Sequence, residues 1–475
     1  MNRSARSQTL LWLSAGVAGL LLANGRWSQP WGAWLALFCL LRFAAAVGPW
    51  LGFGSIMATG FGVNLLVWQG VLPLPSPLYQ IVSGVGAVFL AVPFLLHRSI
   101  APRLAGIGAT FVYPCALVAT QYLHSLISPS GTYGSIAYSQ TFGPLLQVVS
   151  LGGIWALLFF LGWSVSVADR WSRRAPMGRG LLVYGGVALA VLGFGGLRWY
   201  GGGGETRTVQ VAGLVGAFNY DRPIRDDVEA FRQALRDAGR RLLERSAQEA
   251  TAGARIVFWQ EAELPLLKDE ETSFLAAAAD CARAHRIFLG VSLFVLSPEF
   301  PRKWASNKIV WLDPEGKRVI DYAKAHPTPA EAVVRGPEKI ETVASEVGRL
   351  GSVICFDLDF PAFLRQAGRQ RADLLCVPAN DWREITPYHA HIATFRAIEQ
   401  GFALVRATGN GQSVACDSSG RELAALTLFD NAAGVLRAEV PVVGRRTLYT
   451  LVGDAWVAVC VGGLAVLAIG ALRRR

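Results

Sequence analysis

Charged residues are scarce in this sequence. Only 17% of its 475 residues are Asp, Glu, Lys or Arg, whereas 52% are hydrophobic and the mean hydropathy is +0.35. Soluble globular domains carry about 25% charged residues, so this composition excludes an ordinary soluble enzyme. Most of the apolar excess lies in the first 200 residues. We therefore expect a chain embedded in a membrane.

Lys and Arg are missing from two loops between apolar segments, near residues 73–76 and 127–144. Cytoplasmic loops hold an excess of these residues, so we expect these two loops on the outer side of the membrane. Arginines lie instead in loops 97–103 and 170–179 and at the C-terminus, residues 473–475. Both chain ends are therefore predicted to be cytoplasmic.

Closely spaced cysteines are absent too. Of the seven cysteines, four lie outside the expected membrane spans: Cys281, Cys355, Cys376 and Cys416. These four lack the spacing of a disulfide framework or a zinc site. His389 and His391 stand two apart on an expected helix and so point to different faces, which favours two solvated or capping histidines. Zinc-protease, serine-hydrolase and phosphate-loop motifs are missing. No metal and no cofactor are expected.

The sequence also lacks a groove-reading motif or an aromatic stacking platform for nucleic acid. Its net charge of +11 at neutral pH needs no such partner, because basic cytoplasmic loops that face anionic lipid account for much of it. Nucleic-acid binding is therefore excluded, and membrane lipids are the expected neighbours.

The sequence does contain long apolar runs. Their lengths approach or reach the roughly 20 residues that are needed to cross a bilayer. The first follows Arg3 and Arg6 and resembles a cleaved signal sequence, but six further runs follow it and favour a membrane anchor. The eight expected spans lie at residues 9–24, 31–49, 52–72, 77–96, 104–126, 145–168, 180–197 and 453–472.

This pattern predicts three parts. Residues 1–200 form a membrane domain with about seven helices. Residues 201–449 form an extracytoplasmic domain, because seven spans carry the chain to the outer face. Residues 450–475 form a last membrane helix with a basic cytoplasmic tail.

Residues 201–449 alternate between strand-like and helix-like segments, which is typical of an α/β domain with a largely buried sheet. Strands are expected at 208–215, 255–259, 287–295, 351–356, 373–378, 402–408 and 412–417, with a hairpin across 307–324. Helices are expected near 226–250, 272–286, 360–371 and 386–400.

Three of these strands end beside a reactive side chain. Glu261 follows the strand 255–259, Lys324 ends the hairpin, and Cys355 ends the run GSVIC. A carboxylate can take a thiol proton, a thiolate can attack a carbonyl, and an ammonium can hold the oxyanion that forms. The structural alternatives are a helix-capping Glu261, a solvated Lys324 and a Cys355 that is a small core residue.

The thiol and the base each raise a further point. A helix is expected to begin at Phe360–Pro361, and a thiol near a helix N-terminus has a lowered pKa, which predicts a reactive Cys355. The segment QEAELP offers both Glu261 and Glu263, which share one face of an extended chain. Geometry alone does not choose between them.

Three segments resemble, in order and spacing, the Glu, Lys and Cys motifs of the nitrilase or carbon-nitrogen hydrolase superfamily: FWQEAELP (258–265), YAKAHPTPAE (322–331) and ICFDLDFP (354–361). A domain of this kind between a bundle of spans and one last span is similar to the apolipoprotein N-acyltransferase family. Segments 138–155 and 380–413 also resemble that family's outer-surface segment and its Asn-Asp-x-Trp and Arg-Ala-x-Glu block.

The resemblance implies an αββα sandwich carried by an α-helical membrane bundle. It implies Glu261 as general base, Lys324 as oxyanion stabiliser and Cys355 as nucleophile. The family pattern, in which the acid follows Trp-x, selects Glu261 over Glu263.

Three further residues are implied as supporting or substrate-binding: Glu331, Phe356 and Asp357. The family's loop after the lysine is one residue longer, so Glu331 matches its second glutamate only approximately. The run Cys355-Phe356-Asp357 stands where the family usually has Cys-Tyr-Glu. These differences concern the lid and the acyl-chain pocket more than the triad.

The resemblance also implies a reaction. A fatty acyl chain would pass from a membrane phospholipid, through a thioester on Cys355, to the N-terminal α-amine of diacylglyceryl-cysteine in a lipoprotein. The enzyme would lie in the bacterial inner membrane with its catalytic domain on the periplasmic face. Alternatives are a membrane-tethered amidase for small amides, an N-acyltransferase with another acceptor, and an inert binding module with this fold.

Overall fold

The computed structural model describes residues 3–72, 74–201, 207–216, 228–297, 305–430 and 432–473. The chain divides into two compact units. A helical unit comprises Met1–Gly202 and Leu451–Arg475, and an α/β unit comprises Gly203–Thr450. The end of the expected basic tail, residues 474–475, lies outside the described residues.

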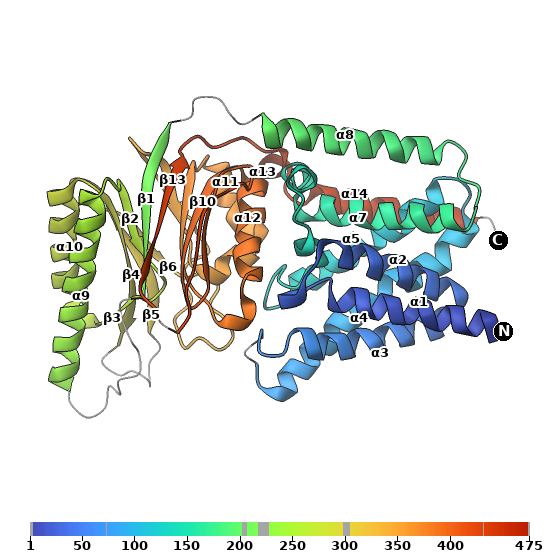
Figure 1. Ribbon diagram of the computed structural model, residues 1–475, viewed down its shortest axis with the longest axis horizontal. Coiled ribbons are helices and arrows are strands. Elements are labelled where there is room, and N and C mark those ends of the chain that lie inside the picture. Colours follow the sequence, from blue (N-terminus) through green and yellow to red (C-terminus); the bar gives the residue numbers. More distant parts are fainter. Residues whose placement is uncertain are drawn as a thin grey trace. The chain divides into compact units, whose positions relative to one another are not determined.

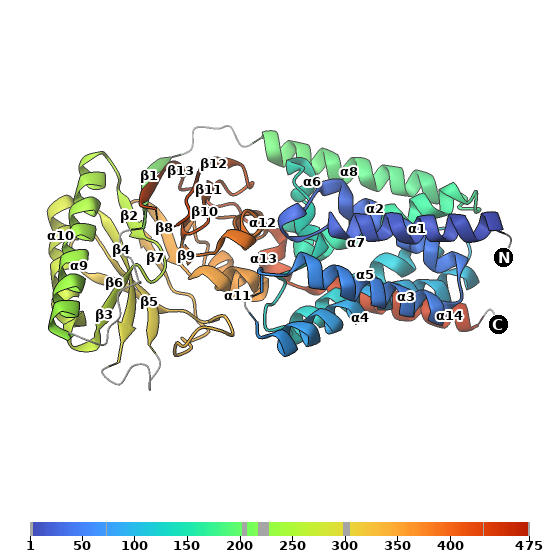
Figure 2. The same cartoon turned by 60° about the horizontal axis from the view of Figure 1, so that its bottom comes forward.

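Long helices make up the helical unit and run alongside one another as a bundle (Figures 1 and 2). Proline stands in the first turn of α2, α3 and α4, where its missing N–H leaves no helical hydrogen bond unmade. The helices are α1 (Arg3–Leu21), α2 (Pro30–Ala46), α3 (Pro49–Val67), α4 (Ser76–Ile100), α5 (Gly108–Ile127), α6 (Gly143–Leu146), α7 (Val149–Ser172), α8 (Gly180–Tyr200) and α14 (Ala455–Leu472).

Five of these helices are long and apolar enough to cross a membrane: α3, α4 with the turn that follows it, α7, α8 and α14. Of the other three expected spans, α2 has 17 residues, α1 begins with two arginines, and α5 contains Gln121 and His124. The expectation of about eight spans is therefore not confirmed. The five apolar helices nevertheless indicate a membrane protein.

The expected span 145–168 is interrupted in the structure. The backbone is non-helical at Gly152 and at Gly153, whose φ of +66° is readily adopted only by glycine. The straight part of α7 therefore begins at Ile154, and the residues before it form a separate short helical segment.

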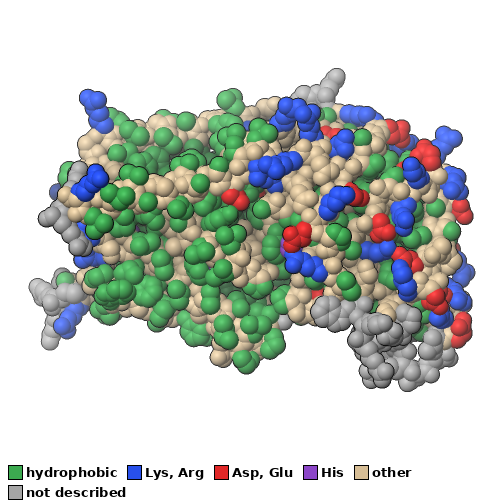
Figure 3. Space-filling view, turned by 180° about the vertical axis from the view of Figure 1, so that it is seen from behind, with side chains coloured by type: hydrophobic (Ala, Val, Ile, Leu, Met, Phe, Trp, Pro, Cys, Tyr) green, Lys and Arg blue, Asp and Glu red, His purple; other side chains and the backbone are tan. Residues whose placement is uncertain are grey.

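Apolar side chains cover the outer surface of the helical unit. Figure 3 shows hydrophobic side chains over the long helices, whereas Lys, Arg, Asp and Glu gather over the α/β unit. Leu182, Leu189 and Leu197 of α8 are 77%, 74% and 79% exposed. Such a continuous apolar surface is unfavourable in water and suits contact with lipid.

Two sheets form the α/β unit. The first has the strand order β13-β1-β2-β4-β5-β6 with β3 paired to β4, and the second has the order β12-β11-β10-β9-β8-β7. The first contains β1 (Thr208–Val215), β2 (Ile256–Trp259), β3 (Leu264–Leu267), β4 (Phe288–Leu296), β5 (Ser306–Leu312), β6 (Arg318–Ala323) and β13 (Gly434–Pro441). The second contains β7 (Thr342–Ser345), β8 (Gly348–Ser352), β9 (Leu374–Asn380), β10 (Ala403–Gly409), β11 (Gln412–Cys416) and β12 (Glu422–Thr427).

Two helices cover the outer face of each sheet (Figure 1). Helices α9 (Val228–Thr251) and α10 (Glu271–His285) lie on the first sheet, and α11 (Pro361–Arg369) and α12 (Tyr388–Gln400) lie on the second. A last short helix, α13 (Leu448–Val452), spans the second junction between the units. The layer order is αββα, which confirms the nitrilase-like sandwich.

The inner faces of the two sheets pack against each other. One apolar core joins residues of both sheets, such as Val211 and Phe258 from the first and Leu375 from the second. A Cβ at Gly213 of β1 would lie 2.7 Å from the Cβ of Ala407 in β10. A larger residue at this position would push the sheets apart.

Parallel pairing gathers several strand ends at one edge. Strands β1, β2 and β4 are parallel, as are β8, β9 and β10. The residues that follow parallel strands lie at the same edge of a sheet. The N–H of Glu261, just after β2, donates to the carbonyl of Ala379 in β9 at 3.3 Å. This contact joins the two sheets where the candidate site residues lie.

The sequence did not predict four of the strands: β3, β7, β12 and β13. The expected strand 351–356 also ends earlier, at Ser352. Cys355 consequently lies in a turn beyond the strand rather than at its last position.

Candidate active site

A tight turn between β8 and α11 carries Cys355. The chain forms a 3-10 turn over Cys355–Asp359, and α11 begins at Pro361. The φ of Cys355 is +47°, in the left-handed region that residues with a Cβ rarely adopt. Such strain persists only where surrounding contacts fix it, and it clusters at functional sites. The Cys355 side chain is 5% exposed.

Asp357 holds this turn in place. Its Oδ2 accepts hydrogen bonds from the N–H of Ile354 at 2.9 Å and from the hydroxyl of Tyr322 at 2.7 Å. Its Oδ1 accepts one from the N–H of His326 at 2.8 Å. The carboxylate is fully buried and links the Cys355 turn to the segment that follows β6. These contacts suit a supporting residue rather than one that binds substrate.

Phe356, the residue after Cys355, belongs to a group of packed rings on the same turn. It is 9% exposed and packs edge-on against Phe360, with ring centroids 5.7 Å apart. Phe360 in turn stacks on the ring of His326 at 4.0 Å. Cys355 itself is 5% exposed, so water has little access to its thiol.

Lys324, immediately after β6, lies between two carboxylates. Its Nζ is 2.7 Å from Oε1 of Glu261 and 2.6 Å from Oε2 of Glu331. The Nδ2 of Asn307 in β5 donates to both carboxylates at 2.8 Å. Lys324 is only 2% exposed, so it is not the solvated charge of the structural alternative. We call Glu261, Asn307, Lys324 and Glu331 the Lys324 cluster.

The backbone of a single residue, Asn380, connects the base to the thiol. Oε2 of Glu261 accepts a hydrogen bond from the N–H of Asn380 at 3.0 Å, and Sγ of Cys355 lies 3.9 Å from the carbonyl oxygen of the same residue. Asn380 is the last residue of β9. The position of this strand end therefore sets the relative positions of carboxylate and thiol.

Burial dominates the electrostatics of the thiol and the base. It raises the pKa of Cys355, the charge of Glu261 raises it further, and attraction to Lys324 opposes both. The expected lowering of the Cys355 pKa is therefore wrong, because loss of hydration outweighs the turn and the nearby cation. Burial also raises the pKa of Glu261 despite the attraction of Lys324. A protonated thiol thus lies near a carboxylate that is a stronger base than usual.

The other two charges of the Lys324 cluster are firmly ionised. Burial alone would lower the pKa of Lys324, but attraction to Glu261, Cys355 and Glu331 raises it well above the usual value. Burial likewise opposes ionisation of Glu331, but Lys324 and hydrogen bonds from Thr328 and Asn307 lower its pKa. Lys324 therefore offers a permanent positive charge to a developing oxyanion.

A second buried group of ionisable side chains also adjoins Cys355. His389 of α12 places Nδ1 3.0 Å from Oδ1 of Asp381 and Nε2 3.5 Å from Oδ2 of Asp359. Arg406 of β10 places Nη2 2.6 Å from the same Oδ1 of Asp381. His389 is 2% exposed, so the expectation of a solvated or capping residue is wrong. We call Asp359, Asp381, His389 and Arg406 the His389 cluster.

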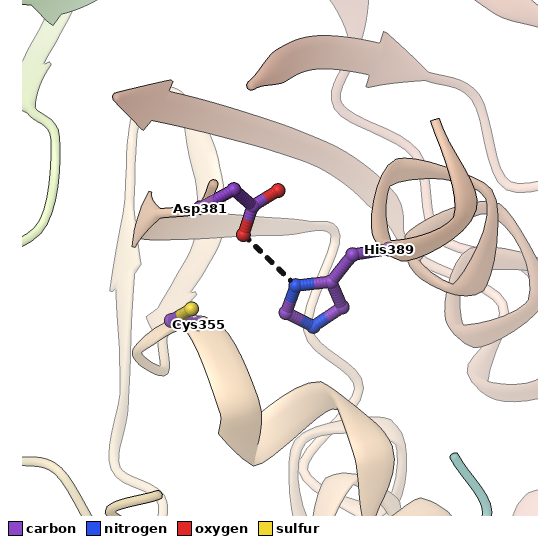
Figure 4. A group of neighbouring side chains, drawn as sticks. All are labelled: Cys355, Asp381 and His389. Atoms are coloured by element: carbon purple, nitrogen blue, oxygen red, sulfur yellow. Dashed lines mark hydrogen bonds and ion pairs between the residues drawn. The ribbon is translucent and has the colours of Figure 1, made fainter. Parts of the chain in front are cut away.

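Three residue types that bind metals meet at this point. Cys355, Asp381 and His389 each present one ligand atom, and these atoms lie within 4.8 Å of one another. Figure 4 shows the Asp381 carboxylate and the His389 ring facing each other beside the thiol. Nη2 of Arg406, however, lies 2.6 Å from the carboxylate and 2.9 Å from Nδ1 of His389. Because this cation already contacts both the carboxylate and the ring, which also contact each other, the group is an ion network rather than a metal site.

The sequence analysis gave no role to Asn307, Asp381 or Arg406, although Asp381 and Arg406 lie in the segment 380–413 that resembles the family. The strand pattern offered a further signal for two of the three. Asn307 and Arg406 interrupt the apolar strands β5 and β10, and polar residues in buried strands need partners. Asp381 follows a strand directly, as the three candidate residues do, but its partners could be found only from the fold.

Comparison with known sequences bears on this geometry. The carbon-nitrogen hydrolase profile matches residues 224–447, a range that contains every residue of both clusters. The chain carries a carbon-nitrogen hydrolase domain.

Relatives resemble the whole chain rather than this domain alone. An apolipoprotein N-acyltransferase from Geobacter metallireducens is 24% identical over 510 aligned positions, which cover 98% of this chain and 96% of the relative. One from Azotobacter vinelandii is 28% identical over 71% of this chain and 68% of the relative. The resemblance to this family is confirmed, and it identifies an acyltransferase enzyme.

Among solved structures, an amidase from Nesterenkonia sp. is similar to part of the chain. It is 21% identical, with a TM-score of 0.41, and the match covers 54% of this chain and 98% of the amidase.

Proposed function

We propose that this enzyme transfers a fatty acyl chain from a membrane phospholipid to the N-terminal α-amine of diacylglyceryl-cysteine in a lipoprotein. Cys355 is the nucleophile, Glu261 the general base and Lys324 the oxyanion stabiliser. The observation that carries this proposal is the buried contact between Glu261 and Lys324 beside a strained cysteine, in a chain whose relatives are apolipoprotein N-acyltransferases.

In the first half-reaction Glu261 takes the proton of the Cys355 thiol as the sulfur attacks the ester carbonyl of the phospholipid. The negative charge that develops on the carbonyl oxygen is stabilised by Lys324. The carbon–oxygen bond then breaks, and the departing alkoxide takes the proton from Glu261. The products are lysophospholipid and an acyl thioester on Cys355.

In the second half-reaction the lipoprotein amine attacks the thioester carbonyl, and Glu261 takes a proton from the nitrogen. The carbon–sulfur bond breaks, and the proton returns to the sulfur of Cys355. Glu331 contacts Lys324, and Asn307 donates to both Glu261 and Glu331. These two residues therefore hold Glu261 and Lys324 in place throughout the reaction. Asp357 keeps Cys355 in its strained turn.

The membrane helices support a lipid substrate. Apolar helices precede the α/β unit and follow it in the chain, so the catalytic unit is tethered at both ends. Both proposed substrates reside in the bilayer, and a tethered enzyme meets them without moving either into water. We place the enzyme in the bacterial inner membrane with residues 201–449 on the periplasmic face, because arginines cluster in the alternate loops.

The experiment is a two-substrate assay of purified full-length enzyme in lipid nanodiscs. Phospholipid with a labelled acyl chain and a diacylglyceryl-cysteine peptide should yield lysophospholipid and labelled N-acyl peptide in equal amounts. Cys355→Ala provides the matched control and should yield neither.

The same assay separates the alternatives. A small-amide hydrolase would release ammonia from simple amides and leave the phospholipid intact. An acyltransferase with another acceptor would release lysophospholipid without acylating the peptide. Either result would overturn the proposed substrates.

A further inference from the structure

His389 lies between the two backbone segments that position the catalytic groups. Its Nε2 faces Asp359, which is the last residue of the 3-10 turn that begins with Cys355. Its Nδ1 faces Asp381, which directly follows Asn380 at the end of β9. One imidazole ring therefore connects the nucleophile turn to a strand end.

That strand end controls the geometry of the reaction. The N–H of Asn380 holds Glu261, and its carbonyl lies beside the Cys355 sulfur. Asp381 is anchored from a second direction, because Arg406 donates to its carboxylate and Gly409 accepts from its N–H at 2.8 Å. A contact that runs from Asp381 through His389 to the nucleophile turn thus fixes the distance from base to thiol.

We propose that His389 is a positioning residue that acts in its doubly protonated form, with each ring N–H directed at one carboxylate. The ring locks the Cys355 turn against the end of β9. This inference rests on the proposed roles of Cys355 and Glu261 but not on the identity of the acyl donor.

The charges around the ring favour this form. Burial and Arg406 oppose the second proton, but attraction to Asp381 and Asp359 outweighs them and raises the pKa of His389. Asp381 is ionised, since attraction to Arg406 and His389 lowers its pKa to about 2 despite burial. Burial raises the pKa of Asp359, and His389 opposes this rise.

Two further groups face the cluster. The thiol of Cys355 lies within 4.8 Å of ligand atoms of Asp381 and His389, and Arg396 of α12 attracts the charge of Asp359. Arg406 is the other cation that faces His389.

The pH dependence follows from the sign of the shift. Below the raised pKa of His389 both contacts are present, and as the pH rises through it one ring proton and one contact are lost. The rate advantage of the wild type over a variant without the imidazolium is therefore largest at low pH and shrinks at high pH. A merely structural residue would give a ratio that does not change with pH.

The test compares wild type and His389→Gln in the full-length enzyme between pH 6 and 9. One readout is acylation of Cys355 by phospholipid vesicles. The other is alkylation of Cys355 by iodoacetamide, resolved by peptide mass, which requires no lipid donor. The partly buried thiol of Cys281 serves as an internal reference. His391→Gln, two positions along α12, is the matched control.

We expect His389→Gln to slow both reactions of Cys355 on the order of 10-fold to 100-fold at low pH, as for a small misplacement of reacting groups. The ratio of the wild-type rate to the His389→Gln rate should approach one as the pH rises. Cys281 should react at an unchanged rate, and His391→Gln should behave as the wild type.

Asp359→Asn provides a second variant that keeps the side-chain shape. Removal of this negative charge lowers the pKa of His389, so the ring loses its second proton at a lower pH than in the wild type. The pH at which the reactions of Cys355 lose the contribution of the imidazolium should therefore also be lower in this variant. This variant decides the question even where His389→Gln does not fold.

A ratio that is flat with pH in His389→Gln, or an unchanged profile in Asp359→Asn, would overturn the proposal. Failure of the wild type to take an acyl group from phospholipid would overturn the proposed function instead. The iodoacetamide readout would in that case still decide the role of His389.

Discussion

The Lys324 cluster and the His389 cluster both adjoin Cys355 and both are buried, but their charges are balanced differently. In the Lys324 cluster one cation lies between two carboxylates, and the pKa of Glu261 stays raised. In the His389 cluster two cations face two carboxylates, and the pKa of Asp381 falls to about 2. An unbalanced group can exchange a proton with a reactant, whereas a balanced one mainly holds the geometry of the segments that it joins.

This difference assigns the clusters different tasks. The Lys324 cluster draws its members from the first sheet and the loop after it, and it supplies the base and the oxyanion charge. The His389 cluster lies entirely on the second sheet, its helix and the Cys355 turn, and it positions the nucleophile. Substitutions in the first should therefore reduce the rate, and substitutions in the second should also reduce stability.

The largest effect on rate is expected from Glu261→Gln. The amide keeps the shape and the contact with Asn307 but cannot take a proton, so thioester formation should fall by about 10²–10⁴-fold. The thermal midpoint should stay close to that of the wild type, since Glu331 still pairs with Lys324. Single-turnover acylation measures the rate of thioester formation, and thermal unfolding in detergent measures the thermal midpoint. A large loss of stability with a retained rate would reverse the assignment of tasks.

Arg406→Met should mainly reduce stability, in contrast to Glu261→Gln, which should mainly reduce the rate. Arg406 contacts Asp381, the hydroxyl of Thr408 at 2.7 Å and the carbonyl of Gln412 at 3.2 Å, all in the interior. Removal of one partner of such a buried pair costs about 3–5 kcal/mol of folding free energy. Chemical unfolding of the full chain should reveal this loss. A variant as stable as the wild type would show that the cluster does not hold the second sheet together.

Glu331→Gln should shift the pH profile more than the maximal rate. The charge of Glu331 contributes to the raised pKa of Glu261, and the reaction needs Glu261 ionised. The rate of the wild type should therefore decline with falling pH already above the usual glutamate range. In the variant the pKa of Glu261 falls, and this decline should move to lower pH. An acid limb that stays in place, or moves upward, would contradict the proposed coupling.

The smallest effect is expected from Glu263→Gln. Glu263 is buried, but Glu261 is the carboxylate 2.7 Å from Lys324 and 3.0 Å from the N–H of Asn380. Acylation should stay within about threefold of the wild type, as expected for a group outside the reacting set. If Glu263→Gln abolished acylation while Glu261→Gln preserved it, the base would have to be reassigned.

The proposed orientation has its own test. A reporter fused after residue 204 should report an external location, and one fused after Arg475 a cytoplasmic one. The reason is the excess of arginine in alternate loops. A cytoplasmic signal from the first fusion would place the catalytic unit away from the proposed lipoprotein acceptor.

The sequence predicted one part of the site better than the other. Glu261, Lys324 and Cys355 each follow an apolar strand within a motif, so local pattern was enough to single them out. The partners of His389 come from a turn, from the end of β9 and from β10, and only the tertiary fold brings these together. Single-residue propensities on α12 could not distinguish a buried imidazole from a solvated one.

The missed strands have similar explanations. Pro265 interrupts the short β3, and proline argues against a strand except at an edge. Strand β12 at the edge of the second sheet is largely exposed on both faces, so it lacks the apolar pattern of an inner strand. The Cys355 turn could not be predicted either, because its positive φ depends on the hydrogen bonds of Asp357.

The central claim is that Cys355 carries the acyl group between the two substrates. Purified enzyme supplied with phospholipid and no amine acceptor should stop after the first half-reaction, because the burial of Cys355 restricts access of water to the thioester. Intact mass should increase by one fatty acyl chain, peptide mapping should place it on Cys355, and a diacylglyceryl-cysteine peptide should remove it as the amide. A wild-type enzyme that remains unmodified in an active lipid preparation, with the Cys355 thiol still free, would contradict the account.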